Sequence, residues 1–98
     1  MIYFLSFTPS AKQSLRELKS SAHLEKRFKA VSKALEYLAR DPRHPSLQTH
    51  RYFSLSGPNR EKIFEAYAEQ DTPAAYRIFF YYGQARGEII VFAITPHP

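Results

Sequence analysis

The C-terminal stretch, residues 74–98 (AAYRIFFYYGQARGEIIVFAITPHP), constrains the fold more than any other part of the chain. Two runs rich in aromatic and β-branched residues flank a five-residue segment, 83–87, that begins and ends with glycine. This pattern predicts two antiparallel strands joined by a short loop. Because side chains alternate along a strand, Arg77 should share one face with Phe79 and Tyr81. An arginine placed among aromatic residues indicates either an ion-pair partner within the sheet or a site for a bound group.

The length and composition of the chain set further limits. A chain of 98 residues predicts one domain with a modest core. The absence of cysteine excludes a disulfide scaffold and a thiolate metal site. No apolar run approaches the roughly 20 residues that a membrane-spanning helix needs, and the first residues, MIYFLSFTPSAK, lack the basic start of a signal peptide. We therefore expect a soluble, cytoplasmic protein with no membrane association.

The net charge of +5 is unevenly distributed along the chain. Residues 1–60 contain eleven Lys or Arg and four Asp or Glu, whereas residues 61–98 contain three and five. A basic surface of this kind suits a polyanion, because each neutralised phosphate releases condensed counterions, and it also suits an acidic protein partner. The alternative is a solvated basic face without a partner.

Local signals define the first elements. The apolar run 2–7 predicts a strand, and Thr8 followed by Pro9 is typical of a helix N-cap with proline at the first helical position. Apolar residues at helical spacing over 11–18 and 24–38 predict two helices that form an antiparallel hairpin. The cations of the second helix lie off its apolar stripe: Lys26, Arg27, Lys29 and Lys33.

A proline directly after Asp41 ends the second helix. The following segment, 41–51, holds two prolines, two histidines and two arginines, and we expect an irregular connection with a functional role. Further strands are expected at 52–55 and 63–68. The order of elements is β-α-α-β-β-β, with the helices first and a mostly antiparallel sheet afterwards, which is an α+β fold.

The sequence contains none of the motifs typical of zinc proteases, phosphate-binding loops or α/β-hydrolases, and no metal-ligand spacing of histidines and carboxylates. We therefore expect no metal or nucleotide cofactor. Cleavage of RNA by its own 2′-hydroxyl needs only a base, an acid for the leaving 5′-oxygen, and cations that stabilise the developing negative charge. Residues suited to these roles are Arg77, His97, His50 and Arg51.

Each candidate also has a structural explanation. Arg77 could simply pair with Glu65 or Glu88 across the sheet. The other candidates are histidines in a loop or at the chain end, which are often solvated, and strand tyrosines, which pack more often than they stack on bases. These residues are His44, His50, His97, Tyr52, Tyr81 and Tyr82.

Four motifs follow one another along nearly the whole chain: FLSFTPSAK (4–12), LARDPR (38–43), AYRIFFY (75–81) and ITPH (94–97). In this order and spacing, the chain resembles the RelE/ParE superfamily of type II toxins. The resemblance implies a small α+β fold with a helical hairpin beside an antiparallel sheet. On the RelE side of the family it implies a ribosome-dependent, metal-independent endoribonuclease that cuts mRNA and is neutralised by a cognate antitoxin with an acidic segment.

The resemblance also implies roles for individual residues. Arg77 matches the arginine that stabilises the scissile phosphate, and His97 matches a C-terminal position that acts in acid or base catalysis. His50 falls where family members carry basic residues, and Glu65 lies near a position where some members use a carboxylate base. Which of these groups is the base and which the acid stays open. The residues expected to contact RNA are Arg51, Arg43, His44, Lys33, Tyr52 and Tyr81.

Two alternatives from other functional classes stay open. The ParE side of the family shares the fold but inhibits DNA gyrase. A member without activity would be a binding module for an acidic antitoxin or a nucleic acid. Several RNase members continue beyond the terminal histidine, whereas this sequence stops at Pro98. The presence of Arg77 together with His97 favours the RNase interpretation.

Overall fold

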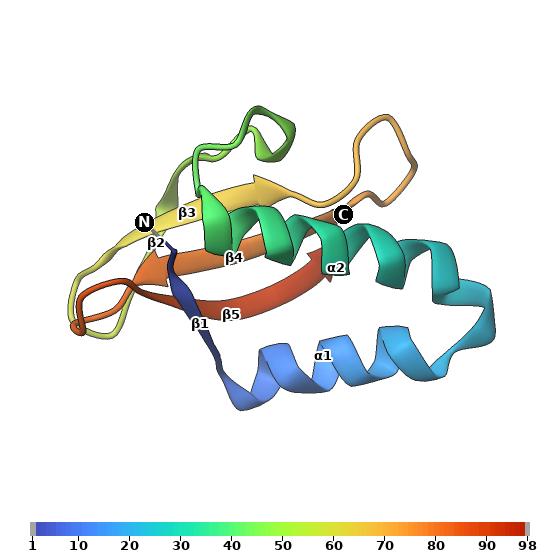
Figure 1. Cartoon of the computed structure of the whole chain (residues 1–98), viewed down its shortest axis with the longest axis horizontal. Helices are drawn as coiled ribbons and strands as arrows, with labels where there is room; N and C mark the ends of the chain where they lie inside the picture. Colours follow the sequence, from blue (N-terminus) through green and yellow to red (C-terminus); the bar gives the residue numbers. More distant parts are fainter. Residues whose placement is uncertain (1, 98) are drawn as a thin grey trace.

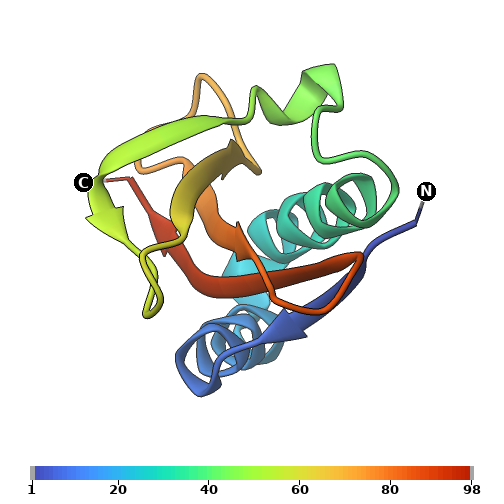
Figure 2. The ribbon, with the colours of Figure 1, turned by 90° about the vertical axis from the view of Figure 1, so that its left-hand side faces the viewer.

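The computed structural model describes residues 2–97. Two helices cover one face of a five-stranded sheet, and the other face is open (Figures 1 and 2). The helices are α1 (Pro9–Ser20) and α2 (Glu25–Arg40), and the strands are β1 (Phe4–Phe7), β2 (His50–Ser56), β3 (Lys62–Tyr67), β4 (Tyr76–Tyr82) and β5 (Glu88–Pro96). Two short 3₁₀ turns, Ala22–Leu24 and Pro45–Leu47, precede α2 and β2.

The predicted α+β class is confirmed, and the observed order is β-α-α-β-β-β-β, in which the two strands of the C-terminal hairpin follow β2 and β3. The strand expected at 52–55 is observed as β2, which begins two residues earlier and lies at the edge of the sheet. Most of its side chains are exposed. A strand of this kind does not need the strict apolar alternation that marks a strand with one face on the core.

The helix boundaries follow local chemistry. The side chain of Thr8 accepts a hydrogen bond from the backbone N–H of Ala11 at 3.3 Å, and Pro9 occupies the first turn of α1, where its missing N–H costs nothing. At the other end of the hairpin, α2 stops at Arg40 because Asp41 precedes a proline and adopts an extended conformation. Both of these predicted boundaries are confirmed.

The strand order is β1-β5-β4-β3-β2, and all neighbours are antiparallel except β1 and β5. The predicted hairpin is confirmed as β4 and β5, joined by residues 83–87. Within this loop Gly87 has a φ of 77°, a left-handed conformation that glycine adopts without strain. The parallel pairing of β1 with β5 was not predicted, and it makes β5 an inner strand.

The hydrophobic core lies between the helices and one face of the sheet. On this side α1 packs against β5 and α2 packs against β4. Alternation along β4 places Ile78 and Phe80 in this core, both fully buried, and leaves Arg77 and Phe79 on the opposite, open face. The open face of the sheet therefore carries the polar side chains that β2, β3 and β4 bring together.

Within residues 2–97, none of the helices combines the length and the apolar character that crossing a bilayer would require.

Candidate active site on the open face of the sheet

Three strands bring an arginine, a glutamate and a histidine into one row. In the register of the sheet His50 lies opposite Glu65, and Tyr67 lies opposite Arg77. One carboxylate oxygen of Glu65, Oε1, is 2.8 Å from Nε2 of His50, and the other, Oε2, is 3.2 Å from Nη1 of Arg77. The glutamate thus joins a histidine and an arginine that are far apart in the sequence.

Glu65 is buried, with 6% of its surface exposed. A carboxylate in that position is costly unless charged or hydrogen-bonding partners surround it. Arg77 is therefore an ion-pair partner, as one of the two structural explanations predicted, and the partner is Glu65 and not Glu88, whose carboxylate accepts a hydrogen bond from Ser6. The Nε atom of Arg77 is also buried, and no hydrogen-bond partner for it is found among residues 2–97. The pairing with Glu65 is made through Nη1.

Tyr67 forms the floor beneath these groups. The Cζ atom of Arg77 lies 3.9 Å from the centre of the Tyr67 ring, a close cation–π contact, and the ring of His50 meets the same tyrosine edge-on at 5.6 Å. Tyr67 was not among the residues predicted from the sequence. Its position two residues after Glu65, on the same face of the strand, was the signal that could have identified it.

Both ring nitrogens of His50 face acceptors. Nε2 contacts the Glu65 carboxylate, and Nδ1 lies 2.9 Å from the backbone carbonyl oxygen of Gln48. Gln48 has a left-handed backbone with a φ of 45°, which turns its carbonyl toward the histidine. In this arrangement both ring nitrogens of His50 are engaged within the chain, and Nε2 holds the Glu65 carboxylate in place.

His97 completes one side of this row. Its backbone N–H donates to the carbonyl of Ala75 at 2.8 Å, so the chain stays attached to the sheet beyond the end of β5 and the residue is not frayed. Its side chain lines a pocket of about 360 Å³ that also contains both members of the Arg77–Glu65 pair. The remaining lining residues are Tyr52, Phe79, Thr95 and Pro96. We call this pocket the histidine pocket.

A second pocket, of about 650 Å³, lies on the other side of Arg77. It is lined mainly by the loop between β3 and β4, together with Gln48, Tyr67 and Arg77. We call it the amide pocket, after the two glutamines, Gln48 and Gln70, in its wall. Arg77 is shared by the two pockets, so a phosphate bound to its guanidinium would have one pocket on each side.

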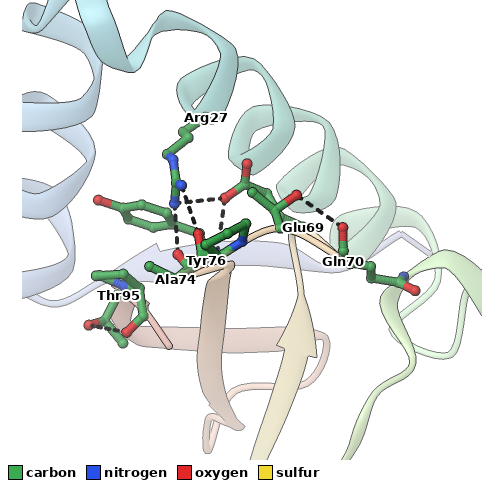
Figure 3. Close-up of polar contacts among 9 residues, drawn as sticks. Arg27, Glu69, Gln70, Ala74, Tyr76 and Thr95 are labelled. Carbon is green, nitrogen blue, oxygen red and sulfur yellow. Dashed lines mark hydrogen bonds and ion pairs between the residues drawn. The ribbon is translucent and has the colours of Figure 1, made fainter. Parts of the chain in front are cut away.

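Arg27 fixes the loop that borders the amide pocket (Figure 3). From α2 its guanidinium donates to the carbonyl oxygens of Ala74 and Pro73 at 2.7 and 2.9 Å, and it pairs with Glu69 at 3.3 Å. Glu69 in turn accepts a hydrogen bond from the backbone N–H of Tyr76. The sequence predicted only that Arg27 lies off the apolar stripe of its helix, and the structure adds that its guanidinium is directed to this loop.

The residues that were predicted to contact RNA lie in different parts of the structure. Tyr52 lies at the histidine pocket, where its ring packs edge-on against Phe79 at 5.1 Å. Tyr81 is on the same face of β4 as Arg77, but only 8% of its surface is exposed, which leaves little of the ring available to a base. Arg51 follows His50 directly, so strand alternation turns it to the helix side, where its guanidinium covers Phe53 at 4.6 Å. The predicted joint action of Arg51 and Arg77 on one phosphate does not match this arrangement.

The remaining three predicted contacts gather near the C-terminal part of α2. His44 stacks on Tyr37 with ring centres 3.9 Å apart, and the amine of Lys33 lies 5.7 Å above the same ring. Arg43 is exposed in the neighbouring turn. These cations form a separate basic area on the helix side of the molecule.

Among residues 2–97, no three or more His, Cys, Asp or Glu side chains are placed so that they could hold a metal ion together.

No protein-family model matches the chain, and no curated protein matches it in sequence. Solved structures do match it. A YoeB/ParE toxin from Agrobacterium tumefaciens has a TM-score of 0.70 at 12% identity, covering 96% of this chain and 98% of that one. The YoeB dimer from Staphylococcus aureus gives 0.68 at 11% identity over 100% of both chains. The archaeal RelE in its complex with RelB from Pyrococcus horikoshii gives 0.64 at 15% identity, covering 98% and 96%.

These likenesses establish the fold. Over nearly its whole length the chain has the α+β fold seen in these YoeB/ParE and RelE structures, which is the fold that the resemblance implied.

Proposed function

We propose that this protein is the toxin of a type II toxin–antitoxin system and that it acts as a ribosome-dependent endoribonuclease on mRNA. The observation that supports this proposal most is the convergence of Arg77, Glu65, His50 and His97 on one open face of a toxin-like fold. The complex of the archaeal RelE with RelB supports the further expectation of a cognate protein partner. An acidic segment in that partner would suit the net charge of +5.

The proposed reaction is an intramolecular transesterification of the RNA backbone. The 2′-oxygen attacks the adjacent phosphorus, the bond from phosphorus to the 5′-oxygen breaks, and the products are a 2′,3′-cyclic phosphate and a free 5′-hydroxyl. One proton leaves the 2′-hydroxyl and one is added to the 5′-oxygen, so no metal, oxidant or cofactor is needed for balance. Arg77 stabilises the extra negative charge on the phosphate oxygens in the transition state.

The two proton transfers fall to Glu65 and His97, which line the histidine pocket together with Arg77. His50 has both ring nitrogens occupied within the chain, and it acts by holding the Glu65 carboxylate in place. This division of roles narrows the sequence-based hypothesis, in which any of the three groups could move a proton.

The test is to induce the chain alone in a bacterial host and to map the 5′ ends of cellular mRNAs. New ends should arise inside coding regions and only during active translation. They should be lost with Arg77→Ala and with His97→Ala, while Arg86→Ala, which removes an exposed arginine from the β4–β5 loop, should behave like the unchanged protein. Circular dichroism of each purified variant establishes that it is folded.

Two outcomes would contradict the proposal. Growth arrest with intact mRNA and an induced DNA-damage response would indicate a gyrase inhibitor. A folded chain that neither arrests growth nor generates new ends would indicate a binding module without activity.

A further inference from the structure

Arg27 reaches the β3–β4 loop from α2, on the helix side of the sheet. Its guanidinium donates through two different nitrogens to the backbone carbonyl oxygens of Ala74 and Pro73, at 2.7 and 2.9 Å (Figure 3). Arg27 lines neither the histidine pocket nor the amide pocket. An influence of Arg27 on the proposed chemistry must therefore act through the backbone that it holds.

Part of that backbone is strained. Ala74 has a left-handed φ of 54°, a conformation that a residue with a Cβ atom adopts only at a cost in free energy. Such a conformation persists where the surrounding contacts enforce it. The side chain of Ala74 is exposed, so packing in the core does not supply this constraint. The hydrogen bond from Arg27 to the carbonyl of Ala74 does supply it.

Ala74 directly precedes the residue to which His97 is bonded. The carbonyl oxygen of Ala75 accepts the hydrogen bond from the backbone N–H of His97 at 2.8 Å. A different backbone conformation at Ala74 would redirect the chain as it enters β4 and would displace the Ala75 carbonyl. The end of β5, which carries His97 to the histidine pocket, would move with it.

We propose that Arg27 is a positioning residue, which keeps Ala74 in its left-handed conformation. By doing so it fixes the Ala75 carbonyl and thereby the place of His97 at the histidine pocket. The effect on cleavage rests on the proposed ribonuclease function, in which His97 moves a proton, whereas the effect on the position of His97 does not. Because a proton transfer needs a well-oriented group, a small displacement of His97 lowers the rate of the chemical step more than it weakens RNA binding.

The experiment follows two quantities in the purified full chain: the amide signal of His97 in ¹⁵N–¹H NMR spectra, and the cleavage of a translated reporter mRNA. Arg27→Ala should shift the His97 amide proton to lower frequency, because its hydrogen bond weakens. It should lower the cleavage rate at saturation by roughly 10- to 100-fold and change the half-saturating mRNA concentration little. Arg27→Lys, which keeps a cation beside Glu69, should give smaller changes in the same direction, and it replaces the alanine variant if that variant does not fold.

A second substitution separates this role from a general loss of stability. Glycine adopts a left-handed backbone without strain, so Ala74→Gly added to Arg27→Ala should restore a large part of the His97 signal and of the cleavage rate. Asp71→Gly in the same background is the matched control and should restore neither. Asp71 is also left-handed, with a φ of 56°, but its carbonyl is not among those that Arg27 contacts. Val31→Ala, which removes buried methyl groups from the same helix, should leave the His97 signal unchanged.

Several results would overturn the inference. These are an unchanged His97 signal in Arg27→Ala, the same shift in Val31→Ala, and a restoration by Ala74→Gly that is absent or no greater than that by Asp71→Gly. A shifted signal with an unchanged cleavage rate would limit Arg27 to a structural role and overturn its part in the reaction. If the unchanged protein does not cleave mRNA, the ribonuclease proposal itself fails, and the NMR measurement still decides whether Arg27 positions His97.

Discussion

Arg77 and Glu65 each serve the fold and the proposed chemistry at the same time. The buried carboxylate of Glu65 is stabilised by its ion pair with Arg77. The side chain of Arg77, which is 15% exposed, is in turn stabilised by that carboxylate and by the ring of Tyr67 beneath it. The sequence alone presented ion pairing and phosphate binding as alternatives. The structure shows that the pairing exists, through Nη1, and that Arg77 also lines the histidine pocket, so pairing and phosphate binding are compatible.

Tyr67 provides a test of this arrangement at the residue scale. Tyr67→Leu removes the cation–π contact, worth about 1–2 kcal/mol for a largely desolvated pair, and frees the guanidinium to rotate away from the pocket. We expect cleavage of a translated reporter mRNA to fall roughly 5- to 30-fold, through the rate at saturation more than through the concentration that gives half-maximal cleavage.

Tyr67→Phe is the matched control, because it keeps the ring and removes only the hydroxyl. It should retain nearly all of the activity. If both variants lose activity equally, the hydroxyl and not the ring face supports Arg77, and the cation–π explanation fails.

At the scale of elements, the features that the sequence predicted are those with a local cause. Thr8-Pro9 starts α1, the proline after Asp41 ends α2, and the glycine-flanked loop 83–87 joins the last two strands. The parallel pairing of β1 with β5 depends on contacts between the two ends of the chain, for which no local signal exists. The shift in register between β2 and β3 is likewise decided by packing.

The same distinction applies to the candidate site. Arg77, His97, His50 and Glu65 were identified by residue type and by resemblance, and the structure places them along one row on the open face. Arg51 was included for its residue type, and because it directly follows His50 in a strand it lies on the other face. The predicted strand began at residue 52, whereas β2 begins at His50, so the alternation that separates the two residues was not applied to them.

Arg27 couples α2 to the loop between β3 and β4, and its replacement tests that coupling. Arg27→Ala removes hydrogen bonds to two backbone carbonyls and one ion pair, which we expect to cost about 1–3 kcal/mol of the free energy of unfolding. Amide hydrogen exchange should accelerate specifically over residues 69–75. Lys29→Ala, which breaks an exposed pair with Glu25, should change the unfolding free energy by less than about 0.5 kcal/mol and leave exchange in the loop unaltered.

For the whole molecule, stability rests on the single layer of core between the helices and the sheet. Phe80 is fully buried in that layer, and Phe80→Ala should cost about 3–5 kcal/mol, a large share of the roughly 5–15 kcal/mol typical of a domain. Phe53→Ala removes the same side chain where 79% of its surface is exposed and should change stability by less than about 0.5 kcal/mol. Urea denaturation of both variants measures the difference, and equal losses would contradict the assignment of the core.

The basic side chains of the molecule do not gather at the candidate site. Lys33, Arg43 and His44 gather near the C-terminal part of α2, whereas the open face carries an arginine that is already paired. The excess of basic residues in the first sixty positions therefore describes the helix side of the molecule, and it does not by itself locate the proposed chemistry.

The inner position of β5 has a consequence for how the protein is made. Because β5 separates β1 from β4, the sheet cannot close while the last strand is still inside the exit tunnel of the synthesising ribosome (Figure 1). Three of the residues that line the histidine pocket, Thr95, Pro96 and His97, lie at the end of β5 or directly after it. The pocket therefore cannot form before β5 has taken its place between β1 and β4.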